Sequence, residues 1–230
     1  MARTMKRKDS AAGFTLLEIL VALFIFVVII TTVFGSYRAV FFNAGDMDQE
    51  VKTHEMAQTC LDRMIQDLYA IHIPVPPEFK PPDINAPPSL YPVSGETVLL
   101  RNAACATLRF SALAHLPFEE PGRDGIAEIR YYVQATADDR LILKRSDVLY
   151  PYEPFVEKGS DPVLCQGLKS LRFFYYDQEG NEFDHWNSDS GDFKFATPRA
   201  IKIRLELENG PQTIALETLV TLPVFREKIG

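Results

Sequence analysis

The sequence predicts an α+β protein in which a long N-terminal helix, with a membrane-spanning first half, packs on an antiparallel β-sheet domain. Three observations lead to this class: an apolar run near the N-terminus, a helical spacing of apolar residues after it, and a two-residue alternation in the rest of the chain. The expected segments are a basic leader, the membrane half and the amphipathic half of the helix, a proline-rich connection and the β domain, at residues 1–13, 14–36, 37–73, 74–96 and 97–230.

The apolar run over residues 14–34 is long enough to span a bilayer. Its 21 residues include only four side chains that are not apolar, Thr15, Glu18, Thr31 and Thr32. With a rise of ~1.5 Å per residue, such a helix measures about 31 Å, close to the hydrocarbon thickness of a membrane. The apolar core of a secretory signal peptide is shorter, about 7–15 residues. The basic residues precede the run, so the N-terminal end is expected to stay cytoplasmic and the C-terminal bulk to cross the membrane; they are Arg3, Lys6, Arg7 and Lys8.

Glu18 places a carboxylate inside this run, although a charge at the bilayer centre costs about 2.5–3.5 kcal/mol on insertion scales. The ordered residues Gly13-Phe14-Thr15-Leu16-Leu17-Glu18 resemble the prepilin signature of type IV pilins and type II secretion pseudopilins. The resemblance implies removal of residues 1–13 by cleavage between Gly13 and Phe14, and methylation of the new Phe14 amine. It also implies that Glu18 pairs with the Phe14 amine of a neighbouring subunit during assembly. The alternative is an ordinary signal anchor that tolerates Glu18 near a helix end.

The helical pattern continues beyond the apolar run. Apolar residues recur at steps of three and four, which is typical of an amphipathic helix; they are Val40, Ala44, Met47, Val51, Leu61, Met64, Ile65 and Leu68. We expect one helix from about residue 14 to residue 72, ended by the prolines that follow. Two helices broken near residues 42–46 are the alternative. Partner subunits are predicted to contact the helix face formed by Val40, Met47, Val51, Leu61 and Leu68.

Short strands are expected after the proline-rich connection. The pattern predicts them at residues 97–102, 106–113, 126–136, 141–146, 164–176, 201–208 and 213–222. Residues 201–207 alternate strictly, so one face of that strand should be buried and the other exposed. Residues 138–139, 178–181 and 209–210 are typical of hairpin turns. These short, hairpin-linked strands predict an antiparallel sheet.

Four features of the mature chain resemble the J-type minor pseudopilin of type II secretion. They are the helix end with Arg63 and the pair Asp67-Leu68, the hairpin Arg130-Tyr131 … Leu143-Lys144-Arg145, the strand 168–177, and Trp186 followed by Thr197-Pro198-Arg199-Ala200-Ile201. Two departures are Thr197, where that family has leucine, and the long proline-rich stretch. The resemblance covers nearly the whole mature chain.

The J-type resemblance implies a structural protein without enzymatic activity or cofactor. It would be a single-pass protein of the bacterial inner membrane, with its C-terminal domain in the periplasm. It would join I-type and K-type minor pseudopilins in a tip complex that starts assembly of the major pseudopilin for the export of folded proteins. A prepilin peptidase/methyltransferase and inner-membrane lipid would be its other partners. A minor pilin of a type IV pilus or DNA-uptake pilus is the alternative, since it shares the N-terminal signature.

The charge of the chain argues against nucleic acid as a partner. The net charge is −7, from 24 basic and 31 acidic residues. The leader contains four of the basic residues and one acid, so its removal leaves 20 basic and 30 acidic residues. An acidic domain does not attract polyanions.

The three cysteines lie at positions 60, 105 and 165. An oxidising compartment permits a disulfide. Cys105 and Cys165 both fall in predicted strands, and the sequence leaves open whether they pair. Cys60 falls on the helix, where a small buried apolar role is expected.

No enzymatic motif is recognisable. The four histidines are scattered, at His54, His72, His115 and His185, and neither a zinc-protease nor a serine-hydrolase motif occurs. Residues 184–192 are dense in oxygen ligands of the kind that Ca²⁺ prefers. Their spacing differs from that of an EF-hand, so a solvated acidic loop is the alternative and metal binding remains open.

Overall fold

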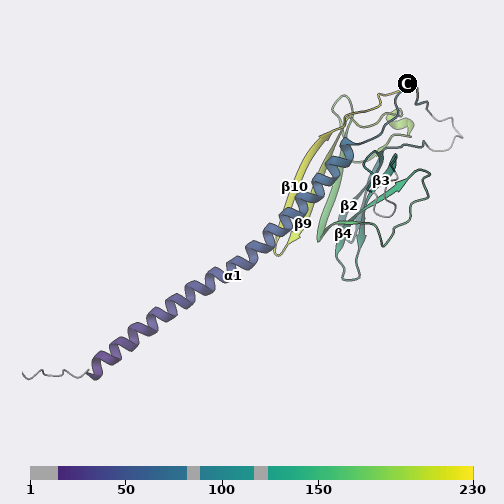
Figure 1. The fold of residues 1–230 in the computed structure, drawn as a ribbon. Coiled ribbons are helices and arrows are strands. Elements are labelled where there is room, and N and C mark those ends of the chain that lie inside the picture. The colour runs from purple at the N-terminus through teal and green to yellow at the C-terminus, as the bar shows by residue number, and fades with distance from the viewer. Residues whose placement is uncertain (1–14, 82–88, 117–123, 230) are drawn as a thin grey trace, which may run out of the picture. The chain divides into compact units, whose positions relative to one another are not determined.

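The computed structural model describes residues 15–81, 89–116 and 124–229, and describes the backbone alone for residues 39–49. The chain divides into two compact units, residues 1–49 and 50–230. Helix α1 (Leu16–Tyr69) is a single helix of 54 residues (Figure 1). The alternative of two helices broken near residues 42–46 is therefore wrong.

The C-terminal end of α1 is fixed by strand pairing rather than by the prolines. After Tyr69, the residue Ile71 forms an isolated antiparallel bridge with Ala112, and the His72 amide donates to the carbonyl oxygen of Ser111 at 2.7 Å. These residues adopt extended backbone because they join the end of a strand. The helix consequently ends three residues before the predicted position.

Among the residues that the structure describes, ten strands form one mostly antiparallel sheet (Figure 1). The path through the sheet is β10-β9-β6-β2-β3-β4-β5, with β1 beside β2 and β8, and β7 beside β6. Among the strand pairs of the described residues, only β2 and β6, at Cys105 and Leu171, are parallel. The strands are β1 (Ser94–Leu100), β2 (Ala103–Ala112), β3 (Ala127–Ala135), β4 (Leu141–Leu149), β5 (Val163–Gln166), β6 (Leu168–Tyr176), β7 (Glu182–Phe183), β8 (Trp186–Asn187), β9 (Ala200–Asn209) and β10 (Gln212–Thr221). A short 3-10 helix, η1 (Gly191–Phe193), precedes β9.

The predicted strand 164–176 is two strands in the structure. Gly167 separates β5 from β6 with a φ of +68°, a left-handed conformation that side chains disfavour. Its carbonyl oxygen accepts the Glu208 amide at 2.8 Å. Because of this break, β5 pairs with β4 while β6 pairs with β9. The first strand also begins three residues before the predicted start at residue 97.

One hydrophobic core joins the sheet to α1 within the second unit. Strand β9 buries Ile201, Ile203, Leu205 and Leu207 completely and alternates them with more exposed residues, so the predicted alternation is confirmed. The helix contributes buried residues at steps of three and four, as an amphipathic helix should; they are Ala57, Cys60, Leu61, Met64 and Leu68. Because these core residues of α1 pack against the sheet, charged side chains on the same face of α1 also lie against the sheet.

Candidate functional site

Glu18 lies in the first turn of α1, where its side chain helps to cap the N-terminus of the helix. The Glu18 carboxylate accepts the Thr15 amide at 3.0 Å and the Thr15 hydroxyl at 3.1 Å, and the Glu18 amide donates to the Thr15 hydroxyl oxygen at 3.3 Å. This reciprocal arrangement is a capping box, which satisfies amide groups that have no partner within the helix. Thus Glu18 has a local role in a single chain, in addition to any role between chains.

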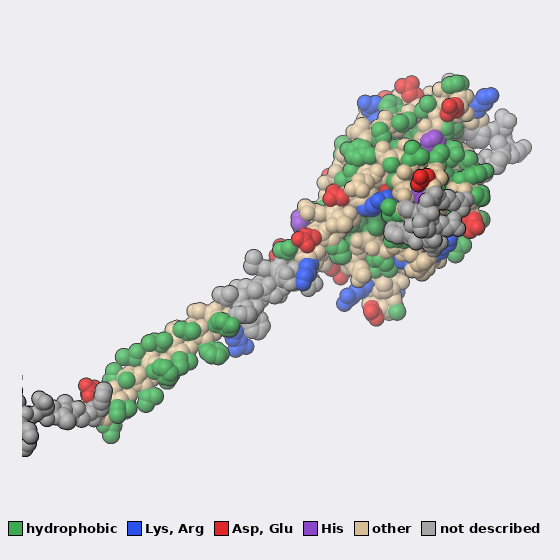
Figure 2. Space-filling model, in the orientation of Figure 1, with side chains coloured by type: hydrophobic (Ala, Val, Ile, Leu, Met, Phe, Trp, Pro, Cys, Tyr) green, Lys and Arg blue, Asp and Glu red, His purple; other side chains and the backbone are tan. Residues whose placement is uncertain are grey.

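The helix that follows Glu18 is long and apolar enough to cross a membrane. The candidate span is Leu16–Arg38, and none of its most apolar window is buried within the chain. Figure 2 shows the hydrophobic side chains along the visible face of this segment. Its hydroxyl groups bond to the helix itself: Thr31 donates to Val27 at 2.8 Å, and Thr32 donates to Val28 at 2.9 Å. Such internal bonding is what hydrocarbon requires of a polar group.

The expected processing residues, Gly13 and Phe14, lie outside the described residues. The predicted partner-contact face is only partly placed by the structure. Leu61 and Leu68 are 7% and 0% exposed, because they pack into the core of their own domain. In the single chain these two residues are therefore occupied by the core, and their contact with partners stays a prediction.

The remaining residues of that predicted face differ in their surroundings. Val51 is 52% exposed and stays available to a partner. Val40 and Met47 lie in the part of α1 where only the backbone is described.

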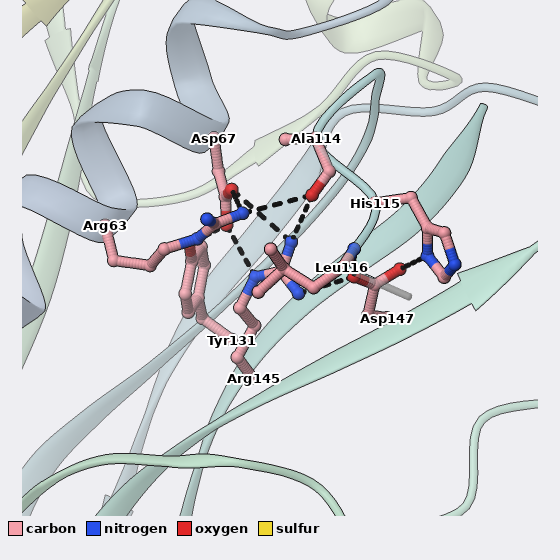
Figure 3. A network of polar contacts seen from close by, with 8 residues as sticks. All are labelled: Arg63, Asp67, Ala114, His115, Leu116, Tyr131, Arg145 and Asp147. Carbon is pink, nitrogen blue, oxygen red and sulfur yellow. Dashed lines mark hydrogen bonds and ion pairs between the residues drawn. The ribbon is translucent and has the colours of Figure 1, made fainter. Parts of the chain in front are cut away.

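The second candidate site is a buried polar network where α1 meets the sheet (Figure 3). We use this name for the residues Arg63, Asp67, Tyr131, Arg145 and Asp147. Asp67, on the helix, is completely buried and accepts hydrogen bonds from three side chains. Arg63 and Tyr131 donate through short contacts, and Arg145 donates through Nε at 2.6 Å. The carboxylate is therefore fully paired despite its burial.

Arg145 extends the buried network from Asp67 to Asp147. Its Nη1 donates to Asp147 at 2.6 Å, and its Nη2 donates to the Ala114 carbonyl oxygen at 2.9 Å. Asp147 also accepts the Leu116 amide at 2.9 Å and lies 2.7 Å from Nδ1 of His115. The positive charges of Arg63 and Arg145 thus balance the negative charges of Asp67 and Asp147 inside the domain.

Two groups of the buried network, Arg145 and Tyr131, have pKa values shifted by their surroundings. Burial alone lowers the pKa of Arg145, but hydrogen bonds and attraction from Asp67 and Asp147 more than offset this and raise its pKa above the ordinary value. Burial raises the pKa of Tyr131, and the adjacent Asp67 raises it further, so the phenol stays protonated and donates. Arg145 and Tyr131 therefore keep the protonated forms that donate their hydrogen bonds.

The buried network brings together residues from separate sequence motifs. Arg63 and Asp67 come from the helix end, whereas Tyr131 and Arg145 come from the β3–β4 hairpin. Truncating one partner of a buried charge pair costs about 3–5 kcal/mol, because the other charge is left without compensation. The arrangement links the helix to the sheet through a buried ion pair and a buried hydrogen bond.

The pair Cys105 and Cys165 is not linked in the structure. All three cysteines are free and buried. In the strand order, β3 and β4 separate β2, which contains Cys105, from β5, which contains Cys165. Cys60 is 1% exposed, as expected for a small buried residue on the helix.

The residues 184–192 use their oxygen atoms locally. Asp189 accepts the Ser89 amide at 3.1 Å, Ser190 donates to Asp192 at 3.0 Å, and Asp184 lies 2.9 Å from Nδ1 of His185. Within the described residues, no group of three His, Cys, Asp or Glu side chains is arranged to hold a metal ion.

Arg226 is a buried residue that the sequence analysis missed. Its Nε donates to the Phe195 carbonyl oxygen at 2.6 Å and its Nη2 to that of Ser188 at 3.2 Å, while its guanidinium lies 3.4 Å from the centre of the Phe79 ring. Burial lowers its pKa to about 10. An isolated arginine near a chain end has no pattern in sequence that would reveal this role.

Comparison with known proteins identifies the N-terminal segment. Residues 8–34 match the family model described as the prokaryotic N-terminal methylation motif. No curated protein matches the chain significantly. The motif and the α+β architecture support a type IV pilin-like or pseudopilin protein, and among the described residues one helix is long and apolar enough to serve as its membrane anchor.

Proposed function

We propose that this protein is a J-type minor pseudopilin of the type II secretion system. It belongs to the pseudopilus tip complex that initiates pseudopilus assembly for the export of folded proteins. The observation that carries the proposal is the meeting of two J-type motifs, the Asp67-Leu68 helix end and the β3–β4 hairpin, in one buried ion pair at 2.6 Å. A motif whose residues depend on each other structurally is a stronger indication than the same residues taken singly.

In the proposed function, the leader, the apolar helix, the sheet domain and Glu18 each have a defined role. The prepilin peptidase/methyltransferase removes residues 1–13 and methylates Phe14. The apolar helix holds the protein in the inner membrane, with the sheet domain in the periplasm. Glu18 then exchanges its capping contacts with Thr15 for the amine of a neighbouring subunit, because an amine and a carboxylate in lipid each need a counter-charge.

The proposed partners are the I-type and K-type minor pseudopilins and, below the tip, the major pseudopilin. They would bind exposed positions such as Val51 rather than Leu61 and Leu68, which the domain's own core occupies. Nucleic acid is not among the proposed partners, since acidic residues outnumber basic ones, 31 to 24.

A minor pilin of a type IV pilus or DNA-uptake pilus is the second candidate, because the N-terminal methylation motif occurs in both classes. Deleting the gene and assaying secretion, twitching and DNA uptake in one strain separates them. Loss of secreted hydrolases with intact motility and uptake supports the pseudopilin. Intact secretion with lost motility or uptake assigns the protein to a pilus instead.

A further inference from the structure

A cleft with an excess of basic side chains lies where the β1–β2 turn and the β3–β4 turn meet strands β6 and β9. Its volume is about 640 Å³, within the range of about 300–1,000 Å³ that ligand pockets occupy. Five basic and three acidic residues line it, a formal charge of +2 in a chain whose net charge is −7. We call these eight residues the basic cleft; they are Arg101, Arg140, Lys169, Arg172, Arg204, Asp139, Glu206 and Glu208.

The arginines that β6 and β9 contribute to the basic cleft lie on the face of the sheet opposite the hydrophobic core. On β6, Arg172 is exposed, whereas its neighbours Leu171 and Phe173 are buried in the core that the sheet shares with α1. On β9, Arg204 is exposed beside the buried Leu205. Successive side chains of a strand point to opposite faces, so both arginines point away from the core. The inference therefore does not depend on the proposed function of the helix.

The strand register places two positive charges directly opposite each other. Arg172 on β6 pairs with Arg204 on β9, and like charges in such a position destabilise a sheet. Arg204 has a carboxylate partner in Glu217 on β10, with its Nε 2.7 Å from the carboxylate oxygen. For Arg172, the described residues provide no carboxylate partner. Its guanidinium therefore keeps all its donors available.

The acidic residues of the basic cleft leave a second guanidinium available as well. Asp139 forms an ion pair with Arg101, which joins the two turns, and Glu206 accepts the Ser170 hydroxyl at 2.8 Å. Arg140, next to Asp139 in the β3–β4 turn, is exposed and has no carboxylate partner among the described residues. The cleft thus presents two unpaired guanidinium groups to a ligand.

We propose that the basic cleft binds an acidic segment of a partner protein, with carboxylates of that segment on Arg172 and Arg140. A guanidinium group matches a carboxylate through two parallel hydrogen bonds. A carboxylate beside Arg172 also offsets the repulsion from Arg204. A peptide in which acidic residues alternate with neutral ones can approach the arginines while it avoids Glu206 and Glu208. A uniform polyanion such as nucleic acid fits less well, because these acids and the negative domain repel it.

Fluorescence anisotropy with the full-length protein in a nonionic detergent tests the proposal. The probe is a fluorescein-labelled peptide of alternating glutamate and glycine, and the control peptide has glutamine in place of glutamate. We expect the glutamate peptide to bind and its affinity to fall as salt is added, whereas the glutamine peptide should not bind. Absence of binding by the glutamate peptide, or equal binding of both peptides, would overturn the proposal.

Substitutions within and outside the basic cleft locate the binding site. Arg172→Gln and Arg140→Gln should each raise the Kd of the glutamate peptide about five-fold, the loss expected for one exposed ion pair. Arg199→Gln is the matched control, since Arg199 is also exposed but does not line the cleft. Equal losses in all three variants would mean that only the net charge matters, and the cleft would not be the site.

Thermal stability separates binding from folding in these variants. Without peptide, the Tm of Arg172→Gln should equal or exceed that of the parent, because the substitution removes the repulsion between Arg172 and Arg204. A lower Tm would make Arg172 a structural residue and contradict the proposal. A single-stranded oligonucleotide provides the last comparison. If it binds as tightly as the glutamate peptide and responds equally to Arg172→Gln, the cleft is a general anion site and the acidic peptide is not its specific ligand.

Discussion

Polar side chains at the two ends of α1 form hydrogen bonds with different kinds of partner. In the apolar segment Leu16–Arg38, every described side chain is exposed and the hydroxyl groups bond to the helix itself. In the segment 50–69, Asp67 is completely buried and bonds to side chains of the sheet. The side chains of the first segment thus stay exposed, whereas those of the second pack into their own domain. One continuous helix can serve both purposes because its backbone needs no outside partner.

Of the variants proposed, the one that blocks the processing site should produce the largest change. It acts on the apolar end of the chain alone. Gly13→Ile replaces the small residue next to the expected cleaved bond, so the precursor should accumulate in the membrane without shortening. Gly35→Ala is the matched control, because an added methyl group there has nothing within 4 Å. Immunoblots of the two variants beside the parent report the chain lengths. Normal shortening of Gly13→Ile would place the cleavage elsewhere.

Breaking the buried network should affect the folded domain without altering processing. Arg145→Ala leaves the Asp67 carboxylate buried without its main partner, so the free energy of unfolding should fall by about 3–5 kcal/mol. Arg204→Ala removes an ion pair of similar length, 2.7 Å to Glu217, but both side chains are more than 40% exposed. Its effect should stay below about 1 kcal/mol. Denaturant titration of both variants measures the difference.

A double variant tests whether Asp67 and Arg145 stabilise the domain through each other. Asp67→Asn combined with Arg145→Met removes both charges, so it should be less destabilised than the sum of the two single variants. Additive losses would mean that the 2.6 Å contact between Asp67 and Arg145 contributes little.

Glu18→Gln separates the two roles of Glu18. Glutamine keeps an oxygen that can accept from the Thr15 amide, so the capping box survives, while the charge is lost. An amine without a counter-charge in lipid costs at least about 2.5 kcal/mol, which corresponds to a fall on the order of fifty-fold in incorporation. Processing should be normal, and crosslinking to pseudopilin partners should measure the loss. Full incorporation of Glu18→Gln would limit Glu18 to capping its own helix.

The sequence predicted the architecture because the governing patterns are local. The apolar run, the helical spacing and the alternation at residues 201–207 each follow from neighbours within a few residues. The break at Gly167 was missed, because strand-forming residues flank it on both sides and only the sheet pairing requires it. The single helix was expected, but its end was not, since Ile71 pairs with a residue about 40 positions later.

The candidate site was less predictable than the fold. Glu18 stood out because it is a charge in an apolar run, whereas the burial of Asp67 and Arg145 gave no such signal. Charged residues on an amphipathic helix usually face solvent, and the partner that makes burial tolerable lies 78 positions away. Motif resemblance singled out Arg63, Asp67, Tyr131 and Arg145 but not Asp147, and only the fold showed that these residues contact each other.

The smallest expected effect is a loss of stability at acidic pH. It should arise in the sheet domain and not in the apolar segment. Burial of the Asp177 carboxyl opposes its ionisation, but hydrogen bonds from Asn181 and Lys228 more than offset this and hold its pKa well below the ordinary 3.8. Folding therefore favours the carboxylate. Its contribution to stability is complete above pH 3.8 and is lost as the pH falls toward the lowered native value.

Asp177→Asn should consequently be less stable than the parent at neutral pH, and the difference should shrink as the pH is lowered below about 4. Asp192→Asn is the control, since that aspartate lies on the exposed surface and contacts only Ser190 among the hydrogen bonds of the described residues. Denaturant titrations at neutral and acidic pH measure both variants. A pH-independent difference for Asp177→Asn would mean that hydrogen bonding to Asn181, which asparagine can partly retain, matters more than the charge that Lys228 neutralises.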